Sequence, residues 1–486
     1  MRTLRVALVA LAAASLSACG IGSAPTAEID VIGAPGDPFE AGVRLSTAGQ
    51  LVRAATAEGL VGLDEQGRVI PAVADRWIVT DDGLSYIFRL RDGSWPDGAA
   101  ISGQSAREAL RLAIAGVAGT SLALDLAAID DVRAMAGRVL EIRLRRPVPD
   151  LLQLLAQPEL GLLRDGAGGG PMTLRRSGQQ AVLTPIAPGR LGLPQPDDWN
   201  EGQRSLILQA LPAHLATSRF SDGKTDIVLG GRFADLPLAQ AVAGLARRPL
   251  KVDPAPGLFG LVVVTTRGWL VVPECREAMS MAIDRDAIGP ALGLSGWSGT
   301  TLIAPPPAGT ASAERWADRT LAQRRNEAAA RLARCKVRNG DPGPLRLALP
   351  NGPGSDALHA RLADDLAAVG IALARVPPGV AGDLRLIDAV ARYPRGEWYL
   401  HQLSCAVLRG PCSEAADAQL AAMEGETDLA KSAQLTNEAL GAAGLANFYI
   451  PLGTPIRWSL VRDRVGGFLP NSVAFHPLPP LAQTGE

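Results

Sequence analysis

The side chains best suited to bind a ligand are concentrated in one segment, VARYPRGEWYLHQLSC, at residues 390–405. The chain of 486 residues contains only 4 Tyr and 8 Trp, yet two Tyr and one Trp lie in this segment, together with two Arg. Guanidinium groups bind carboxylates and phosphates, and aromatic rings stack on ligands or fill a protein core. The segment is therefore either an unusual piece of surface or part of a recognition site.

The rest of the chain offers no arrangement of residues suited to catalysis or metal binding. The four His are far apart, and none stands beside an obvious nucleophile or at a metal-ligand spacing. FSDGKTD (220–226) contains Gly-Lys-Thr, but a phosphate-binding loop requires a Gly where Ser218 stands. GLSGWSG (293–299) lacks the Gly-x-Ser-x-Gly pattern of a hydrolase. We therefore expect a protein that is not an enzyme and that uses neither a cofactor nor a metal.

The composition indicates a folded protein of two or three domains, or one large bilobed body. Hydrophobic residues make up 47% of the chain, which is enough to build large cores. The 48 Lys and Arg balance 49 Asp and Glu, so the chain lacks the basic excess of a nucleic-acid binder.

The N-terminus has the features of an export signal. Two Arg precede the apolar run VALVALAAASLSA, which is too short to span a bilayer stably. The tetrad LSAC, which ends at Cys19, resembles the bacterial lipobox, in which the Cys is lipidated and becomes the mature N-terminus. The alternative is an ordinary signal peptide that contains a Cys. We expect residues 1–19 to be a lipoprotein signal, Cys19 to hold the chain to the membrane, and residues 20–30 to form a flexible tether.

The other four Cys are even in number, as expected for disulfides in an exported chain. Cys405 and Cys412 flank a Gly-Pro turn, so we expect them to pair, which leaves Cys275 to pair with Cys335. Four reduced, buried thiols and a zinc site are the alternatives.

Strand-like and helix-like patterns alternate irregularly, which predicts a mixed α/β protein. Residues 85–91 and 140–146 alternate between apolar and polar side chains, as half-buried strands do. A strand is also expected at 225–231, and helices are expected at 105–119, 150–156, 275–292, 355–370 (with Ser355 as its N-cap) and 417–440.

A longer pattern, GLVGLDEQGRVIPAVADRWIVTDDGLSYIFRLRDGSWPDG, begins at residue 59. Its Asp-Gly turns separate strand patterns, and Tyr86, Phe88 and Leu90 alternate onto one face of a strand. The order and spacing of these features resemble the N-terminal signature of the family 5 extracellular solute-binding proteins, the peptide- and nickel-type receptors of ABC importers. FSDGKTDIVLGG, ECREAMSMAIDRDAI and VGGFLPN resemble further segments of that family, in the same order.

The resemblance implies a periplasmic-binding-protein fold, in which two mixed α/β lobes joined by two hinge crossings close on a ligand. The implied boundaries are 31–253 for lobe I, 254–446 for lobe II and 447–486 for the return into lobe I. The resemblance also implies a monomeric, lipid-anchored periplasmic receptor. It would capture a peptide or related small solute and deliver it to an ABC transporter permease in the inner membrane.

In peptide-type relatives, the segment that matches 390–400 lies at the cleft, and its Asp holds the amino group of a peptide. Matching Tyr393 to the family Tyr places Arg392 at that Asp position and Arg395 at the next acidic position. An Arg binds anions, so the resemblance implies a ligand with an anionic or neutral end. Trp398 and Tyr399 would stack on the ligand or fill the lobe core.

Three alternatives stay open at this point. Arg392 could pair with an acid such as Glu397 or lie in solvent. The protein could be an envelope interaction or assembly protein with a vestigial cleft, which its aromatic content of 4% favours slightly. It could also be a periplasmic hydrolase, although no catalytic set supports this.

Overall fold

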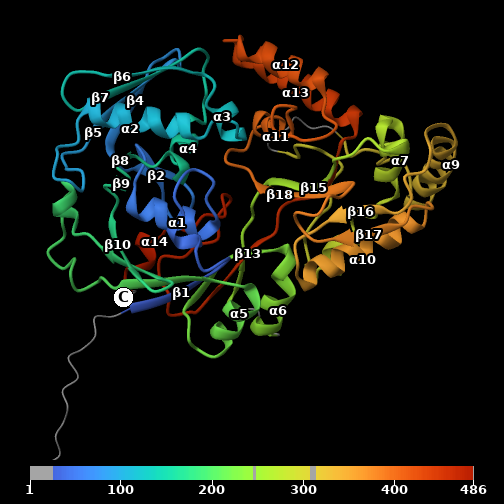
Figure 1. Ribbon diagram of the computed structural model, residues 1–486. Coiled ribbons are helices and arrows are strands. Elements are labelled where there is room, and N and C mark those ends of the chain that lie inside the picture. The colour runs from blue at the N-terminus through green and yellow to red at the C-terminus, as the bar shows by residue number, and fades with distance from the viewer. Residues whose placement is uncertain (1–25, 245–247, 307–312, 485–486) are drawn as a thin grey trace, which may run out of the picture.

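The computed structural model describes residues 26–244, 248–306 and 313–484, and its two halves lie side by side (Figure 1). Cys19, the expected signal and the first part of the expected tether lie outside the described residues. The tether was expected to continue to residue 30, but the first strand, β1, already begins at Thr26. The apolar residues Ala27, Ile29 and Val31 of β1 are fully buried and form part of a core.

The first lobe is built on a seven-stranded sheet whose central strand, β1, has parallel neighbours on both sides. Helix α1 (Thr47–Thr56) buries Leu51 and Val52 in the same hydrophobic core as residues of this sheet. In spatial order the strands are β10 (Met172–Ser177), β11 (Gln180–Pro185), β12 (Ser205–Leu211), β1 (Thr26–Ile32), β13 (Ile227–Arg232), β20 (Arg457–Val461) and β14 (Leu250–Val252).

A four-stranded antiparallel sheet forms a second layer of the first lobe. In spatial order its strands are β4 (Ala74–Val79), β5 (Ser85–Leu90), β7 (Val139–Leu144) and β6 (Ile129–Ala134). Tyr86, Phe88 and Leu90 of β5 are all buried, which confirms the predicted alternation. Helix α2 (Gly103–Gly116) contacts β6 and β7 and is followed by the short helix α3 (Ser121–Asp125).

The second lobe is built on a five-stranded sheet with the order β17 (Leu373–Val376), β16 (Leu345–Ala348), β18 (Leu384–Val390), β15 (Gly257–Val263) and β19 (Tyr449–Gly453). Every residue of β15 is buried, as its apolar run predicts. Helices α7 (Pro273–Ala282), α9 (Leu321–Asn339) and α10 (Pro353–Ala367) contribute apolar side chains to the core of this lobe.

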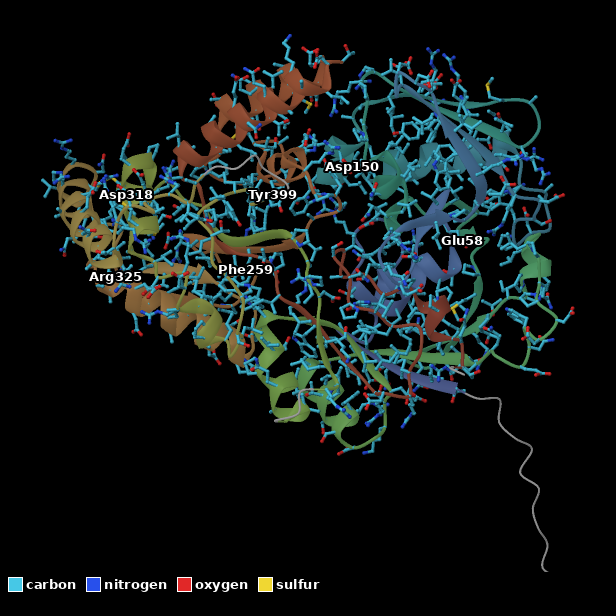
Figure 2. All side chains as sticks on the ribbon, turned by 180° about the vertical axis from the view of Figure 1, so that it is seen from behind. Glu58, Asp150, Phe259, Asp318, Arg325 and Tyr399 are labelled. Carbon is cyan, nitrogen blue, oxygen red and sulfur yellow. A yellow bond between two sulfur atoms is a disulfide. The ribbon has the colours of Figure 1, made fainter. Side chains whose placement is uncertain are left out.

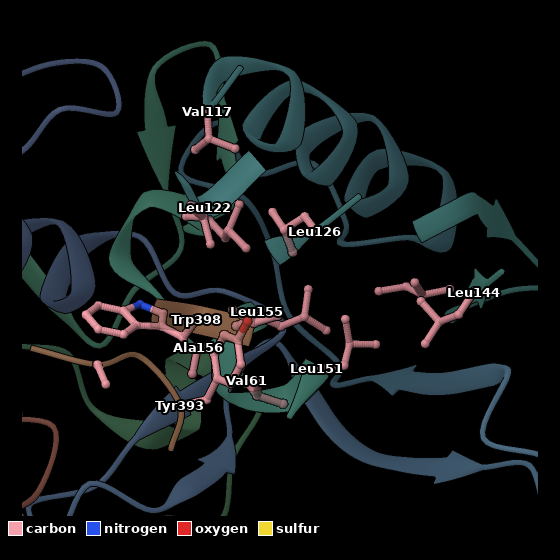
Figure 3. Close-up of a cluster of buried hydrophobic side chains, with 14 of the residues drawn as sticks. Val61, Val117, Leu122, Leu126, Leu144, Leu151, Leu155, Ala156, Tyr393 and Trp398 are labelled. Atoms are coloured by element: carbon pink, nitrogen blue, oxygen red, sulfur yellow. The ribbon is translucent and has the colours of Figure 1, made fainter. Parts of the chain in front are cut away.

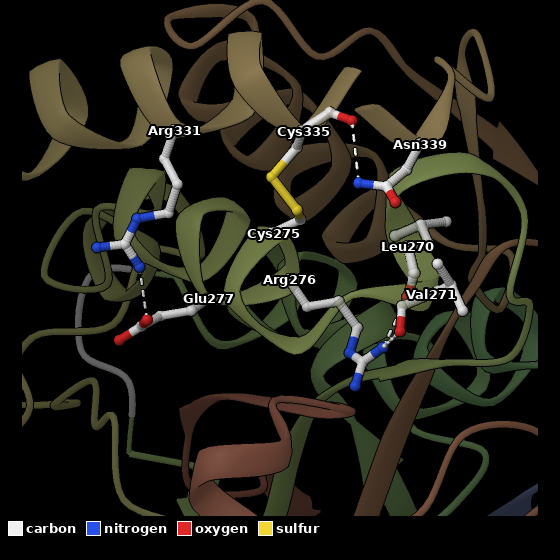
Figure 4. Close-up of a disulfide and its surroundings, with 8 residues drawn as sticks. All are labelled: Leu270, Val271, Cys275, Arg276, Glu277, Arg331, Cys335 and Asn339. Carbon is white, nitrogen blue, oxygen red and sulfur yellow. Dashed lines mark hydrogen bonds and ion pairs between the residues drawn. A yellow bond between two sulfur atoms is a disulfide. The ribbon is translucent and has the colours of Figure 1, made fainter. Parts of the chain in front are cut away.

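Both expected disulfides are present in the structure. Cys275 on α7 is bonded to Cys335 on α9, so the bond ties together two helices of the second lobe (Figure 4). Cys405 and Cys412 close a short loop after helix α11 (Gly396–Leu403). Helices α12 (Glu414–Glu424) and α13 (Leu429–Ala446) then pack against each other.

The chain passes between the two large sheets at two places. The first crossing is the segment between Val252, which ends β14, and Gly257, which begins β15. The second crossing lies between Gly453 and Arg457, because β19 belongs to the second sheet and β20 to the first. The resemblance placed the return at residue 447, but β19 still pairs with β15, so the return comes later.

Three helix predictions need correction. The helix expected over 275–292 ends at Ala282, because Ile283 is extended, and a separate helix α8 spans Ile288–Ala291. The helix expected over 417–440 is interrupted after Glu424, and thus becomes α12 and α13. Ser355 is buried inside α10 and is not its N-cap, since Gly352 takes that position ahead of Pro353.

The remaining described elements are short or peripheral. They are β2 (Val61–Leu63), β3 (Val69–Pro71), α4 (Leu151–Leu155), β8 (Leu163–Arg164), β9 (Ala167–Gly168), α5 (Ala213–Ser221), α6 (Leu236–Ala243), α14 (Leu478–Leu481) and five short 3₁₀ helices at 37–39, 158–160, 188–191, 233–235 and 268–271.

Within the described parts of the chain, no helix combines the length and the apolar character needed to cross a bilayer.

Candidate functional site

A cavity of about 290 Å³, here called the interlobe cavity, lies where residues from the two lobes and the returning strand meet. The first lobe contributes residues of α1, the 157–159 segment and the end of β13, and the second lobe contributes the end of β18 and α11. Its charged and aromatic lining residues are Glu159, Arg232, Asp253, Asp388, Arg392, Trp398, Arg457, Trp458, Phe475 and His476.

A larger groove of about 950 Å³ adjoins the interlobe cavity. The two hollows share Asp253, Ala391, Arg392 and Val473 as lining residues. The groove is lined by both crossings between the sheets and by Trp297 of the second lobe. The residues of 390–394 therefore lie between two hollows at the boundary of the lobes.

The structure places Arg392 against the first lobe rather than free in the cavity. Its Nη1 atom lies 3.4 Å from Oδ2 of the buried Asp125, at the end of α3, and donates to the Ser121 hydroxyl. The hydroxyl of Tyr393 donates to Oδ1 of Asp125 at 2.8 Å, and Nδ1 of His401 lies 2.7 Å from the same oxygen. Arg392 thus pairs with an acid, but the acid is in the other lobe.

Tyr393 remains protonated over a wide pH range. Burial raises the pKa of its hydroxyl well above 10, and the negative charge of Asp125 raises it further. A protonated hydroxyl is a hydrogen-bond donor, which is the role that the Asp125 carboxylate requires of it. Tyr393 therefore contributes one hydrogen bond to the contact between the two lobes.

The other three predicted site residues have different environments. Arg395 forms an ion pair with Asp150 of the first lobe. Figure 2 labels Asp150 in the first lobe and Tyr399 in the second. Trp398 lines the interlobe cavity with a side chain that is 1% exposed. Tyr399 is buried in the core beside Trp398, with ring centroids 5.0 Å apart, and burial raises its pKa to about 12.

The contact between the lobes is apolar as well as ionic. Figure 3 shows Trp398 and Tyr393 among Val61, Leu155 and Ala156 of the first lobe, and all five belong to one continuous core. Buried aromatic side chains such as Trp398 and Tyr393 dominate the energetics of such contacts. The segment that stood out in the sequence is therefore the part of the second lobe that touches the first.

Sequence reasoning missed the charged group on the cavity wall. Arg457 donates from Nη1 to Oδ1 of Asp388 at 2.7 Å, and Arg232 approaches the same carboxylate at 3.8 Å. Partial loss of hydration lowers the pKa of the half-exposed Arg232, and the positive charge of Arg457 lowers it further, while Asp388 raises it. Arg232 is the last residue of β13 and Arg457 is the first residue of β20, whereas Asp388 lies within β18, so no shared local pattern marked the three residues.

The other two acids of the cavity differ in how well they are paired. Asp253 accepts from the backbone N–H of Asn471 at 3.0 Å, and its Oδ2 lies 3.2 Å from Nε2 of His476. Oε1 of Glu159 accepts a long hydrogen bond of 3.5 Å from the Gln50 amide.

Solved structures of similar shape decide which fold this is. The murein tripeptide binding protein MppA of Escherichia coli aligns with a TM-score of 0.79 over 95% of this chain and 99% of its own, at 18% identity. OppA of Haemophilus influenzae in complex with RPPGFSPFR aligns at 0.78, with 95% and 99% covered and 16% identity. NikZ of Campylobacter jejuni in complex with Ni(L-His) aligns at 0.71, with 90% and 94% covered and 17% identity.

The chain has the fold of a family 5 solute-binding protein. The fold that the resemblance implied, with two mixed α/β lobes, is thus confirmed.

Sequence similarity to curated relatives is found over parts of this chain. A protein named "Probable deoxycholate-binding periplasmic protein YgiS" of Escherichia coli is 35% identical over 140 residues, which cover 24% of this chain and 25% of that protein. The glutathione-binding protein GsiB of Salmonella paratyphi A is 24% identical over 272 residues, which cover 52% and 50%. The matches therefore span a quarter to a half of these relatives, and no protein-family model matches the chain.

Proposed function

We propose that this protein is a periplasmic receptor that encloses a peptide or a related small solute between its lobes and delivers it to an ABC transporter permease. The observation that carries the proposal is the interlobe cavity, whose wall combines Glu159 and Arg232 of the first lobe with Asp388 and Trp398 of the second. A solute that contacts both walls stabilises the closed arrangement by its preference for that state.

The relatives support a receptor rather than an enzyme. Their names describe binding of glutathione, deoxycholate, a murein tripeptide or an oligopeptide, and none describes a catalysed reaction. We further propose that the protein acts as a monomer held to the membrane by lipid on Cys19. A single acyl chain binds a bilayer only marginally, so several chains on this Cys are required for stable anchoring.

A thermal-shift screen with short peptides and small solutes tests the receptor function. A ligand that binds only the folded state raises the melting temperature in proportion to the logarithm of its concentration. Ala389 lines the cavity, so Ala389→Trp should remove the response. Ala374→Trp is the matched control, because Ala374 is exposed on β17.

If the screen finds no ligand and the protein stably captures an envelope protein, the receptor function is contradicted and an assembly role is supported. A ligand whose effect is equal in both Trp variants would place binding outside the interlobe cavity.

A further inference from the structure

Two guanidinium groups share a single carboxylate on the wall of the interlobe cavity. Arg457 holds Asp388 closely, with Nη1 2.7 Å from Oδ1 and Nη2 donating to the backbone carbonyl at 3.1 Å. Nη1 of Arg232 is 3.8 Å from Oδ2 and 3.4 Å from the same carbonyl. Two positive charges against one negative charge leave an excess of one positive charge at this point.

The two arginines differ in how far their donors are used. The Arg457 side chain is 11% exposed, whereas the Arg232 side chain is 50% exposed and lines the cavity. Among the described residues, Nε and Nη2 of Arg232 have no hydrogen-bond acceptor, whereas Arg457 makes three hydrogen bonds. Arg232 therefore has donors to offer to a ligand.

The remaining charged groups of the cavity do not neutralise Arg232. Arg392 is paired with Asp125, and Asp253 is held by Asn471 and His476. Glu159 is bonded to Gln50 through Oε1, while its Oε2 is buried without a partner.

We propose that the receptor selects solutes that carry a carboxylate, and that the Arg232 guanidinium binds this group. The inference rests on the proposed receptor function and names the class of its ligand. A guanidinium binds a carboxylate through two parallel N–H donors, which an amide or hydroxyl cannot match. A bound carboxylate also offsets the repulsion between Arg232 and Arg457. The interlobe cavity of about 290 Å³ is large enough to hold the carboxylate end of such a solute.

This assignment replaces the one made from the sequence. The resemblance pointed to Arg392 as the group that sets the charge preference, but that guanidinium already faces Asp125. Arg232, at the end of β13, is the arginine with unused donors.

Matched acids and amides test the proposal. Amino acids, alanine dipeptides, succinate and glutarate, each with its amide, are titrated calorimetrically at millimolar concentration into the wild-type protein. We expect acids to bind and their amides to bind at least about tenfold more weakly. Arg232→Gln should weaken binding of the acids by a similar factor, and Arg232→Lys should restore part of it.

The control is Arg133→Gln, since the Arg133 side chain is 46% exposed and pairs with Asp131 outside the cavity. Equal binding of acids and amides, or acid binding that Arg232→Gln leaves unchanged, would overturn the proposal while the receptor function stands. If no solute of either kind bound to any variant, both the proposal and the receptor function for small solutes would be contradicted.

Discussion

The Nδ1 atom of His401 lies 2.7 Å from a carboxylate oxygen of Asp125, although 276 positions separate the two residues in the chain. Both side chains are buried, and Asp125 also binds Arg392 and Tyr393. A buried carboxylate is tolerated only when hydrogen bonds and charges replace its hydration. Asp125 is therefore one of the points at which the second lobe is bound to the first.

Substitution of Asp125 should weaken the contact between the lobes. Asp125→Ala leaves His401 without its acceptor and Arg392 with only the Ser121 hydroxyl, and loss of one partner of a buried ion pair costs about 3–5 kcal/mol. Tyr393→Phe removes one hydrogen bond only and should cost about 1 kcal/mol. Chemical denaturation measures both losses.

The surface variant Asp131→Ala serves as the control, because its partner Arg133 is largely exposed. Equal stability of Asp125→Ala and Asp131→Ala would contradict the role given to Asp125.

The two disulfides should contribute unequally to stability. The Cys275–Cys335 bond closes a separation of 60 residues, and the Cys405–Cys412 bond closes 7. A longer loop loses more entropy in the unfolded chain, so removing the first bond should cost about 4 kcal/mol and removing the second about 2.5 kcal/mol. Unfolding in guanidinium of the variant with both Cys275 and Cys335 changed to Ala, and of the variant with both Cys405 and Cys412 changed to Ala, measures the two losses of stability. A larger loss for the second variant would refute this account.

Asp383 should make the second lobe sensitive to acid. Burial raises its pKa, but the hydrogen bonds from the Arg267 side chain and from the Arg346 backbone N–H outweigh this effect, so the pKa is lowered overall. A carboxyl with a lowered pKa in the folded state contributes its full stability above the unfolded-state pKa, and loses it as the pH falls through the folded-state pKa.

We therefore expect Asp383→Asn to be less stable than the wild type at neutral pH, with a difference that shrinks below the ordinary pKa of Asp. Urea unfolding at a series of pH values measures this difference. Asp75→Asn is a surface control, because Asp75 lies 4.0 Å from Arg89 in an exposed pair. A deficit that stays constant down to strongly acidic pH would rule out the proposed role of Asp383.

Lipid on Cys19 should hold the protein to the membrane. Cys19→Ser removes the proposed site of lipidation, so the variant should appear in the soluble fraction of lysed cells. Lipid supplies the apolar surface that holds a polar protein to a bilayer. Sedimentation of the Ser variant with membranes in high salt would contradict the anchor.

The sequence predicted the elements whose pattern is local. Alternation of Tyr86, Phe88 and Leu90 identified β5, because each of these side chains follows the two-residue period of a strand. The break of α7 after Ala282 was not predicted, because the apolar spacing continues through Ile283 while the backbone becomes extended there.

The site itself depends on contacts between distant parts of the chain. Arg232, Asp388 and Arg457 lie on three strands that meet only when the chain has crossed between the lobes twice. Likewise, no local pattern could pair Arg392 with Asp125, which is 267 positions away. Sequence similarity located the segment, and the fold determined which of its side chains reach the cavity.

The central claim is that the interlobe cavity holds a small solute, and native mass spectrometry of protein purified from its source tests it most directly. We predict a bound species of low mass that is released on denaturation, that is retained by Ala374→Trp and that is absent from Ala389→Trp, which fills the cavity. A protein that carries no small molecule in any form, or one whose cargo survives Ala389→Trp, would contradict the account.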